Sequence, residues 1–350
     1  MSGFYQLTPE AQGECVARLA RVALAEWGLE ARALDLLKYR ENAVFRVAAS
    51  DGRQYALRVH RAGYHSDAEL RSELSWMRAL LADNFDVPEL VPASNGELFI
   101  TAAHPDVPEP RQVDLFGWIG GRPLGGVEGA LEGETEALAR TFRTIGTLAA
   151  RLHNQAERWT PPPGFTRHAW DTDGLVGEQP FWGRFWELVA LSASQRSLLE
   201  RARSRVRSEL SRLERSPRNY GLIHADFAPE NLMVDGTRIR LLDFDDAGYG
   251  WHLFEIATSL YFHIGQPYFA AIERAVLEGY RTERALTPAD EALLPLFYTA
   301  RSFTYLGWVH TRFETETARE LTPMLVDLCC GVATRFLETP VALDSPGLEA

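Results

Sequence analysis

The chain has 350 residues, of which 46% are hydrophobic and 24% are charged, and its formal net charge is −12. This length can bury the cores of two lobes, and the excess of acidic residues disfavours nucleic acid as the main partner. The sequence has no apolar run long enough for a membrane span and no signal-peptide pattern, so we expect a cytoplasmic protein without a membrane partner. Its three cysteines, Cys15, Cys329 and Cys330, form neither a disulfide framework nor a metal-ligand pattern.

The residues before position 120 show mainly strand patterns, with two helices among them. Thr8-Pro9-Glu10 is a helix start, because a capping residue precedes a proline suited to the first helical turn, and Gly28 is expected to end this helix. Ser66-Asp-Ala-Glu69 is a capping box and predicts a second helix. Strands are predicted near residues 43–49, 53–59, 97–103 and 111–118.

The segment Gly120-Gly-Arg-Pro-Leu-Gly-Gly126 interrupts every periodic pattern and separates two kinds of sequence. We expect an α+β protein with an antiparallel N-terminal lobe over residues 1–119, a linker at 120–126 and a mainly helical lobe over 127–350. In the second lobe, helical periodicity predicts helices near 134–154, 181–191, 195–214, 252–263, 268–283, 288–313 and 319–338.

A strand, a loop and a hairpin interrupt these helices. The loop carries the motif His224-x-Asp226-x-x-Pro229-x-Asn231, and Asp243 follows the hairpin. We expect the hairpin to bring Asp226, Asn231 and Asp243 to one end of the same small sheet. The predicted strands and turn are residues 220–224, 231–234, 235–236 and 238–243.

Phosphoryl transfer of the protein-kinase type requires these residue types in this order. Asp226 would accept the proton of an acceptor hydroxyl, while Asn231 and Asp243 would hold the metal ions that bridge the ATP phosphates. In the alternative, structural interpretation, His224 is a buried histidine, Asp226 a turn residue, Asn231 a cap and Asp243 a strand-end acid. The number of matching positions favours the catalytic hypothesis. The structural context of the motif tests that hypothesis.

With His224, Asp226, Pro229, Asn231 and Asp243-Phe-Asp-Asp246, the chain resembles the aminoglycoside phosphotransferase and choline kinase family of kinase-like phosphotransferases. Residues 40–47, 117–124 and 148–153 are similar to the family's nucleotide loop, inter-lobe hinge and the helix after it. Residues 301–308 also resemble a C-terminal helix of bacterial stress-response Ser/Thr kinases of the same group. The resemblance implies a bilobal protein-kinase-like fold, with ATP and Mg²⁺ or Mn²⁺ as cofactors.

The resemblance also implies that Arg58 binds the ATP phosphates, at a strand position where the family carries a lysine. Arginine keeps the positive charge and offers two donors to phosphate, although its reach and shape differ from those of lysine. Lys38, the only lysine in the sequence, is the alternative. Glu73 on the second predicted helix would orient Arg58, and Glu69 one turn earlier could do the same.

Three further residues are candidates for contact with the nucleotide. Asn42 is predicted to shape the turn over the phosphates, although its loop lacks the Gly-x-Gly-x-x-Gly pattern. The backbone of Phe116-Gly-Trp118 would bind adenine, with apolar side chains beside the base. A plain turn and a core strand would suit the same residues. Candidates for the acceptor pocket are Trp251, His252, Tyr305, Trp308 and Arg312.

The sequence therefore predicts an ATP- and Mg²⁺-dependent phosphotransferase that uses a hydroxyl group as acceptor. We expect a small molecule of the amino alcohol, homoserine, sugar or aminoglycoside type, and a protein Ser/Thr is the alternative. A nucleotide-binding protein without catalysis is a third hypothesis, against which the intact Asp226, Asn231 and Asp243 argue. No interface pattern indicates an oligomeric state.

Overall fold

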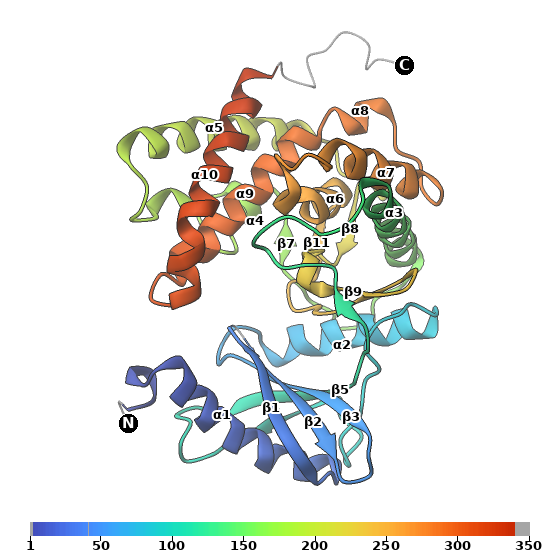
Figure 1. Cartoon of the computed structure of the whole chain (residues 1–350), viewed down its shortest axis with the longest axis vertical. Helices are drawn as coiled ribbons and strands as arrows, with labels where there is room; N and C mark the ends of the chain where they lie inside the picture. Colours follow the sequence, from blue (N-terminus) through green and yellow to red (C-terminus); the bar gives the residue numbers. More distant parts are fainter. Residues whose placement is uncertain (1–2, 41, 340–350) are drawn as a thin grey trace. The chain divides into compact units, whose positions relative to one another are not determined.

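The computed structural model describes residues 3–40 and 42–339, so Glu41 of the predicted nucleotide loop and residues 340–350 lie outside the described residues. The chain divides into two compact units. The first extends to Gly121 and includes residues 160–166 and 240–242, and the second contains the rest. Figure 1 shows strands in the first and mostly helices in the second, which confirms the predicted α+β class. Within these residues, no helix combines the length and apolar character that a membrane crossing requires.

In the first unit, the predicted helix follows the short 3₁₀ turn η1 (Phe4–Gln6). Helix α1 (Pro9–Ala23) has Thr8 as its cap and continues as the 3₁₀ turn η2 (Leu24–Trp27), which ends at Gly28 with φ of 63°. Gly28 suits this position because glycine adopts the left-handed conformation without a steric penalty. Helix α2 (Asp67–Ala82) starts at the predicted capping box, in which Ser66 and Glu69 exchange hydrogen bonds.

An antiparallel sheet forms the rest of the first unit. Its strand order is β1-β2-β3-β5-β4, and all of the paired strands run antiparallel. Strand β1 was not predicted, because adjacent Leu36 and Leu37 are both exposed and irregular register breaks its alternation. The strands are β1 (Ala31–Tyr39), β2 (Ala43–Ala49), β3 (Gln54–Val59), β4 (Phe99–Ala102) and β5 (Arg111–Gly117).

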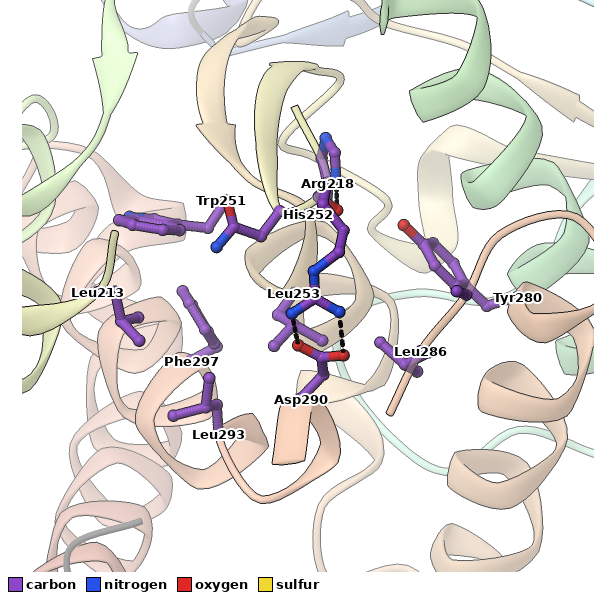
Figure 2. A pocket seen from close by; sticks show the side chains of 12 residues that line it. Leu213, Arg218, Trp251, His252, Leu253, Tyr280, Leu286, Asp290, Leu293 and Phe297 are labelled. Atoms are coloured by element: carbon purple, nitrogen blue, oxygen red, sulfur yellow. Dashed lines mark hydrogen bonds and ion pairs between the residues drawn. The ribbon is translucent and has the colours of Figure 1, made fainter. Parts of the chain in front are cut away.

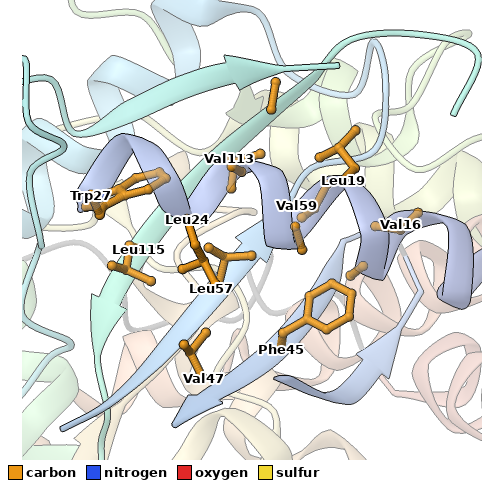
Figure 3. Packing of buried hydrophobic residues seen from close by; sticks show 14 of the residues in the cluster. Val16, Leu19, Leu24, Trp27, Phe45, Val47, Leu57, Val59, Val113 and Leu115 are labelled. Atoms are coloured by element: carbon orange, nitrogen blue, oxygen red, sulfur yellow. The ribbon is translucent and has the colours of Figure 1, made fainter. Parts of the chain in front are cut away.

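The two faces of this sheet have different roles. Figure 3 shows Phe45, Leu57 and Val113 packed with Val16 and Leu19 of α1, and these side chains are buried. Side chains alternate between the faces of a strand, so the neighbouring positions 58 and 114 lie on the opposite face. Burial of the apolar face against α1 therefore fixes the register that presents positions 58 and 114 together.

The second unit is mainly helical. The prediction of a helix at 181–191 is wrong. Only the 3₁₀ turn η3 (Phe185–Glu187) forms there, after Gly183, which has φ of 109°. The helix predicted at 288–313 is two helices, α8 and α9. The helices and remaining 3₁₀ turns are α3 (Thr135–Arg158), α4 (Thr172–Val176), α5 (Ala193–Arg212), η4 (Pro229–Asn231), α6 (His252–Leu260), η5 (Tyr261–His263), α7 (Phe269–Arg281), α8 (Pro288–Glu291), α9 (Leu294–Thr311) and α10 (Glu316–Glu338).

Helices α3 and α7 lie side by side, as Figure 1 shows. Their backbones approach closely because Gly146 faces the Val276 carbonyl and Gly279 faces the Arg143 carbonyl, with no room for a Cβ atom at either glycine. This packing sets the positions of His153 on α3 and Tyr280 on α7.

Two small sheets contain the remaining strands of the described residues. One has the order β10-β9-β6 and the other the order β7-β11-β8. The prediction that Asp226, Asn231 and Asp243 lie at one end of the same sheet is therefore wrong, because β8 leads to Asp226 while β9 and β10 flank the hairpin before Asp243. The strands are β6 (Arg122–Pro123), β7 (Ala169–Trp170), β8 (Tyr220–Ile223), β9 (Leu232–Asp235), β10 (Arg238–Leu241) and β11 (Gly248–Trp251).

Candidate active site

The loop after β8 makes a tight turn that exposes one carboxylate. Ala225 has φ of 65°, in the left-handed region that L-residues rarely adopt. The Asp226 backbone N–H donates to His224 Nδ1 at 3.2 Å, and His224, Ala225 and Phe227 are fully buried. The Asp226 side chain retains 19% of its exposure, so its carboxylate is the group that this turn presents to solvent.

Two donors hold the Asp226 carboxylate. Asn231 Nδ2 donates to Asp226 Oδ2 at 2.7 Å and to the Asp226 carbonyl at 3.1 Å. Arg301 Nη2, from α9, donates to Asp226 Oδ1 at 2.7 Å. The structure thus brings together two of the residues that the motif predicted and adds an arginine that the motif did not contain.

The buried carboxylate of Glu255 holds the backbone of the same turn. Glu255 Oε2 on α6 accepts the Ala225 backbone N–H at 2.6 Å, and its Oε1 lies 3.0 Å from His153 Nε2. His153 Nδ1 lies 2.9 Å from the Tyr280 hydroxyl. Burial raises the pKa of Glu255 to about 7, against the opposing effects of His224 and of hydrogen bonds from the backbone. Burial likewise lowers the pKa of His153 well below its usual value.

Asp243 follows β10 and begins a second loop. It is exposed and has φ of 62°. Arg167 donates to the carbonyl oxygens of Asp245 and Ala247, and Trp182 Nε1 donates to Asp246 Oδ1 at 3.2 Å. The backbone that follows Asp243 is therefore held by buried side chains.

Asn231 and Asp243 have the donor chemistry of a magnesium site. Because Nδ2 of Asn231 donates to Asp226, its amide oxygen is left as a ligand atom, and Asp243 supplies a carboxylate. Mg²⁺ prefers oxygen ligands and takes few of them from protein when phosphates supply the others. In the described ranges, no group of three or more His, Cys, Asp or Glu side chains could hold a metal.

In the first unit, Arg58 lies between two carboxylates. Its Nε and Nη2 donate to Asp114 Oδ1 and Oδ2 at 3.1 and 2.7 Å, and Nη2 also donates to Glu73 Oε1 at 2.8 Å. Asp114 faces Arg58 across the β3–β5 pair. Burial alone would raise the pKa of Asp114, but Arg58 and His60 outweigh it and lower that pKa to about 2.

The other nucleotide candidates also lie on this sheet. Asn42 is buried, and its Oδ1 accepts the Arg61 backbone N–H at 3.3 Å. Phe116 is buried with its ring 5.1 Å from the Arg58 guanidinium carbon, whereas Trp118 is partly exposed. Lys38 pairs with Val44 on β2, and Val44 pairs with Arg58 on β3, so the alternative cation lies two strands away, about 10 Å across the sheet.

The acceptor candidates separate into different places. Tyr305 accepts a hydrogen bond from Arg301 Nη2 at 2.7 Å, close to Asp226. Trp251 and His252 instead line a separate pocket of about 30 Å³, beside the ion pair between Arg218 and Asp290 that Figure 2 shows. This volume suits one or two water molecules. Trp308 packs under the guanidinium of Arg312 at 5.2 Å.

Sequence reasoning missed Asp114, Glu255 and Arg301. Glu255 in α6 and Arg301 in α9 are each the one Asp, Glu, Lys or Arg residue of their helix, and each is fully buried. A charged residue among apolar helix positions signals a buried charge that needs a partner. That signal could have singled out both residues, although not the groups that they contact.

Known proteins are similar to this chain in sequence and fold. A family model described as phosphotransferase enzyme family matches residues 33–292. The structure of a microcompartment-associated aminopropanol kinase is 34% identical, with a TM-score of 0.80, over 92% of this chain and 97% of that one. The amicoumacin kinase of Bacillus subtilis (strain 168) is 26% identical over 319 residues, 85% of this chain and 86% of that protein.

A solved amicoumacin kinase, in complex with AMP-PNP, Ca²⁺ and Ami, has a TM-score of 0.72 at 21% identity and covers 96% of both chains. This structure and the aminopropanol kinase superpose on nearly the whole chain, which confirms the expected kinase-like fold. From the extent of the family match and from this shared fold, the chain belongs to the phosphotransferase enzyme family.

Proposed function

We propose that the protein transfers the γ-phosphate of ATP, in the presence of Mg²⁺, to a hydroxyl group of a small molecule. The observation that carries this proposal is the pair of hydrogen bonds from Asn231 to Asp226 within the motif of a phosphotransferase family member. The contact puts a candidate base beside a candidate metal ligand, as kinase-type phosphoryl transfer requires.

Asp226 orients the acceptor hydroxyl and takes its proton. The acceptor oxygen then bonds to the γ-phosphorus, the bond from that phosphorus to the bridging oxygen breaks, and ADP leaves. Asn231 and Asp243 would hold Mg²⁺, which neutralises charge on the phosphates when bound. Positioning and electrostatic stabilisation supply most of the catalysis in such a reaction.

Arg58 binds the ATP phosphates in this proposal, and Glu73 fixes the plane of its guanidinium. The buried ion pair between them supports that assignment. Asn42 shapes the phosphate turn, and the backbone of Phe116 and Trp118 contacts adenine. Lys38 is the competing phosphate ligand, because it is the one lysine of the sequence and so the one side chain with an ammonium group.

An amino alcohol is the first acceptor to test. The related aminopropanol kinase, 34% identical over most of the chain, supports a small amino alcohol, and the Bacillus subtilis relative supports a small-molecule acceptor generally. The net charge of −12 is compatible with a cationic acceptor. A protein Ser/Thr acceptor rests on the resemblance of residues 301–308 alone.

The test measures ADP release with Mg²⁺ and ATP against aminopropanol, ethanolamine, choline, homoserine, sugars, aminoglycosides and Ser/Thr peptides. We expect one amino alcohol to give the highest turnover. Highest turnover on a peptide would favour the protein kinase alternative. ADP release that no compound stimulates would contradict the transfer reaction.

Two substitutions separate the proposed roles. Asp226→Asn should lower kcat by roughly 10²–10⁴-fold, the usual contribution of a general base, with nearly unchanged nucleotide affinity. Asp243→Asn should weaken Mg²⁺-dependent nucleotide binding as well as kcat, because that carboxylate holds the ion. Normal turnover in both variants would show that these residues are wrongly assigned.

A further inference from the structure

Arg301 is the most unusual charged residue of the second unit. It lies on α9, its side chain has 0% exposure, and one of its nitrogens contacts the proposed base. Moving a charge out of water is unfavourable, and a buried ion pair is often no more stabilising than apolar residues of the same volume. Stability alone is therefore a weak reason for an arginine at this position.

Aromatic rings enclose the guanidinium of Arg301. Its Cζ lies 4.2 Å from the Tyr305 ring centre, 5.0 Å from that of Trp182 and 5.4 Å from that of Phe254. Nε and Nη1 have no hydrogen-bond partner among the described residues, so these rings supply the attraction on that side. The rings and the Tyr305 hydroxyl together fix both the place and the plane of the guanidinium.

The fixed guanidinium in turn fixes the carboxylate. Arg301 holds Oδ1 of Asp226 at 2.7 Å, and Asn231 holds Oδ2 at 2.7 Å. Because each oxygen accepts from a donor, the carboxylate cannot rotate about its last bond without breaking a charge-assisted hydrogen bond.

We propose that Arg301 is a positioning residue that holds the Asp226 carboxylate in the orientation required for phosphoryl transfer. The inference rests on the proposed function, in which Asp226 receives the hydroxyl proton. Arg301 touches neither reactant in this role and acts through Asp226. Trp182 extends the same support, because its ring contacts Arg301 while its Nε1 holds Asp246 in the loop after Asp243.

The test compares Arg301→Gln and Arg301→Lys with the native enzyme, using Mg²⁺, ATP and the panel compound of highest turnover. Arg301→Gln should lower kcat by roughly 10–100-fold, since a misplacement of about 1 Å can cost that much, while KM for ATP stays within about 3-fold. Arg301→Lys keeps the charge on a shorter stem, so it should recover part of the lost kcat.

Arg205→Gln is the matched control. Arg205 on α5 also pairs with a buried carboxylate, Glu209, at 2.7 Å, and also lies over an aromatic ring, that of Phe336 at 4.3 Å. Its loss should lower thermal stability by a similar amount and leave kcat unchanged. An equal fall of kcat in both Arg→Gln variants would assign Arg301 a structural role only and overturn the inference.

If Arg301→Gln does not fold, Arg301→Lys and Tyr305→Phe decide the question. Tyr305→Phe keeps the ring and removes the hydroxyl that accepts from Arg301 Nη2, so kcat should fall with KM for ATP unchanged. Native kcat in both variants would reject the inference. Turnover retained by Asp226→Asn would instead reject the role of Asp226 as the base. ADP release that no panel compound stimulates would reject the proposed function itself, so these failures are distinguishable.

Discussion

Arg58 differs from a free phosphate ligand because two buried carboxylates already contact it. Asp114 binds it from the neighbouring strand and Glu73 from α2, and both side chains have 0% exposure. One guanidinium between two carboxylates is held in a fixed plane, since each charge-assisted hydrogen bond constrains its direction. In the proposed role, this pairing fixes the Arg58 guanidinium before ATP binds. The two carboxylates also offset part of its positive charge.

Arg58→Ala should raise KM for ATP and lower kcat together, because phosphate contacts stabilise both the ground state and the transition state. Arg58→Lys should recover part of the loss, since the charge remains near Asp114 and Glu73. Steady-state kinetics with varied ATP provide the measurement.

Lys38→Ala is the control for this experiment. We expect nearly native kinetics, because Lys38 lies on β1, two strands from Arg58. The opposite pattern, with an inactive Lys38 variant and an active Arg58 variant, would transfer the phosphate role to Lys38.

The residue pairs that the sequence could predict are those close in the chain or fixed by a motif. Asp226 and Asn231 are five residues apart, and Arg58 and Glu73 are fifteen apart. Asp114 lies 56 residues from Arg58, and Arg301 lies 75 residues from Asp226. Such contacts depend on strand register and helix packing, which no local pattern encodes.

Among the elements, α6 connects the turn at Ala225 to the helix pair α3 and α7. Glu255 accepts from the Ala225 N–H on one side and contacts His153 on the other, and His153 contacts Tyr280. A neutral Glu255 can donate its proton to His153 and still accept from Ala225. The amide of the variant Glu255→Gln would reproduce this neutral form, because it also offers one donor group and one acceptor oxygen.

The folded-state pKa of Glu255, about 7, lies above the ordinary value of 4.5. The folded state therefore binds this proton more tightly than the unfolded state does. The stability that the protonated Glu255 contributes is fully present below pH 4.5 and is lost as pH rises through 7. The free energy of unfolding of Glu255→Gln, relative to the native protein, should rise over this window by on the order of 3 kcal/mol. Urea unfolding of both proteins at several pH values from 4.5 to 8 measures the difference.

The neighbouring histidines His153 and His252 are present in both proteins, so the effect of their lowered pKa values largely cancels in the comparison. A difference in stability that stays constant across this pH range would show that Glu255 does not titrate there. The prediction would then be wrong even if the variant were less active.

Elements with their own start and stop signals were predicted well. The caps of α1 and α2 and the periodic helices of the second unit follow from local chemistry. Strands β7 and β11 were missed because β7 has only two residues and two of the four residues of β11 are glycines, so neither gives a periodic pattern. They form only by pairing, β11 with β8 and β7 with β11. The apolar residues around Gly183 favoured a helix, but the chain turns at Gly183 and only a 3₁₀ turn forms after it.

At the scale of the whole molecule, the proposed reaction predicts ligand-dependent stability. ADP or ATP with Mg²⁺ should raise the melting temperature by several degrees, because a ligand at 100 times its Kd stabilises the folded state by about 2.7 kcal/mol. Nucleotide without Mg²⁺ should give a smaller shift. Thermal unfolding with each ligand alone and with both is the measurement.

Asp243→Asn should remove most of the shift that depends on Mg²⁺, and Asp226→Asn should retain it. No shift with millimolar nucleotide and Mg²⁺ would count against nucleotide binding as a whole.

The contacts of the Ala225 amide also bear on the order of events in folding. The residues joined in this chain of contacts are separated in sequence by 30, 102 and 127 positions. Contacts between distant segments form slowly, because loop closure must come first. The strained turn at Ala225 therefore becomes stable only after α3, α6 and α7 have assembled. Its amide hydrogen should exchange with solvent as slowly as those of the helical core, although the carboxylate of the next residue faces water.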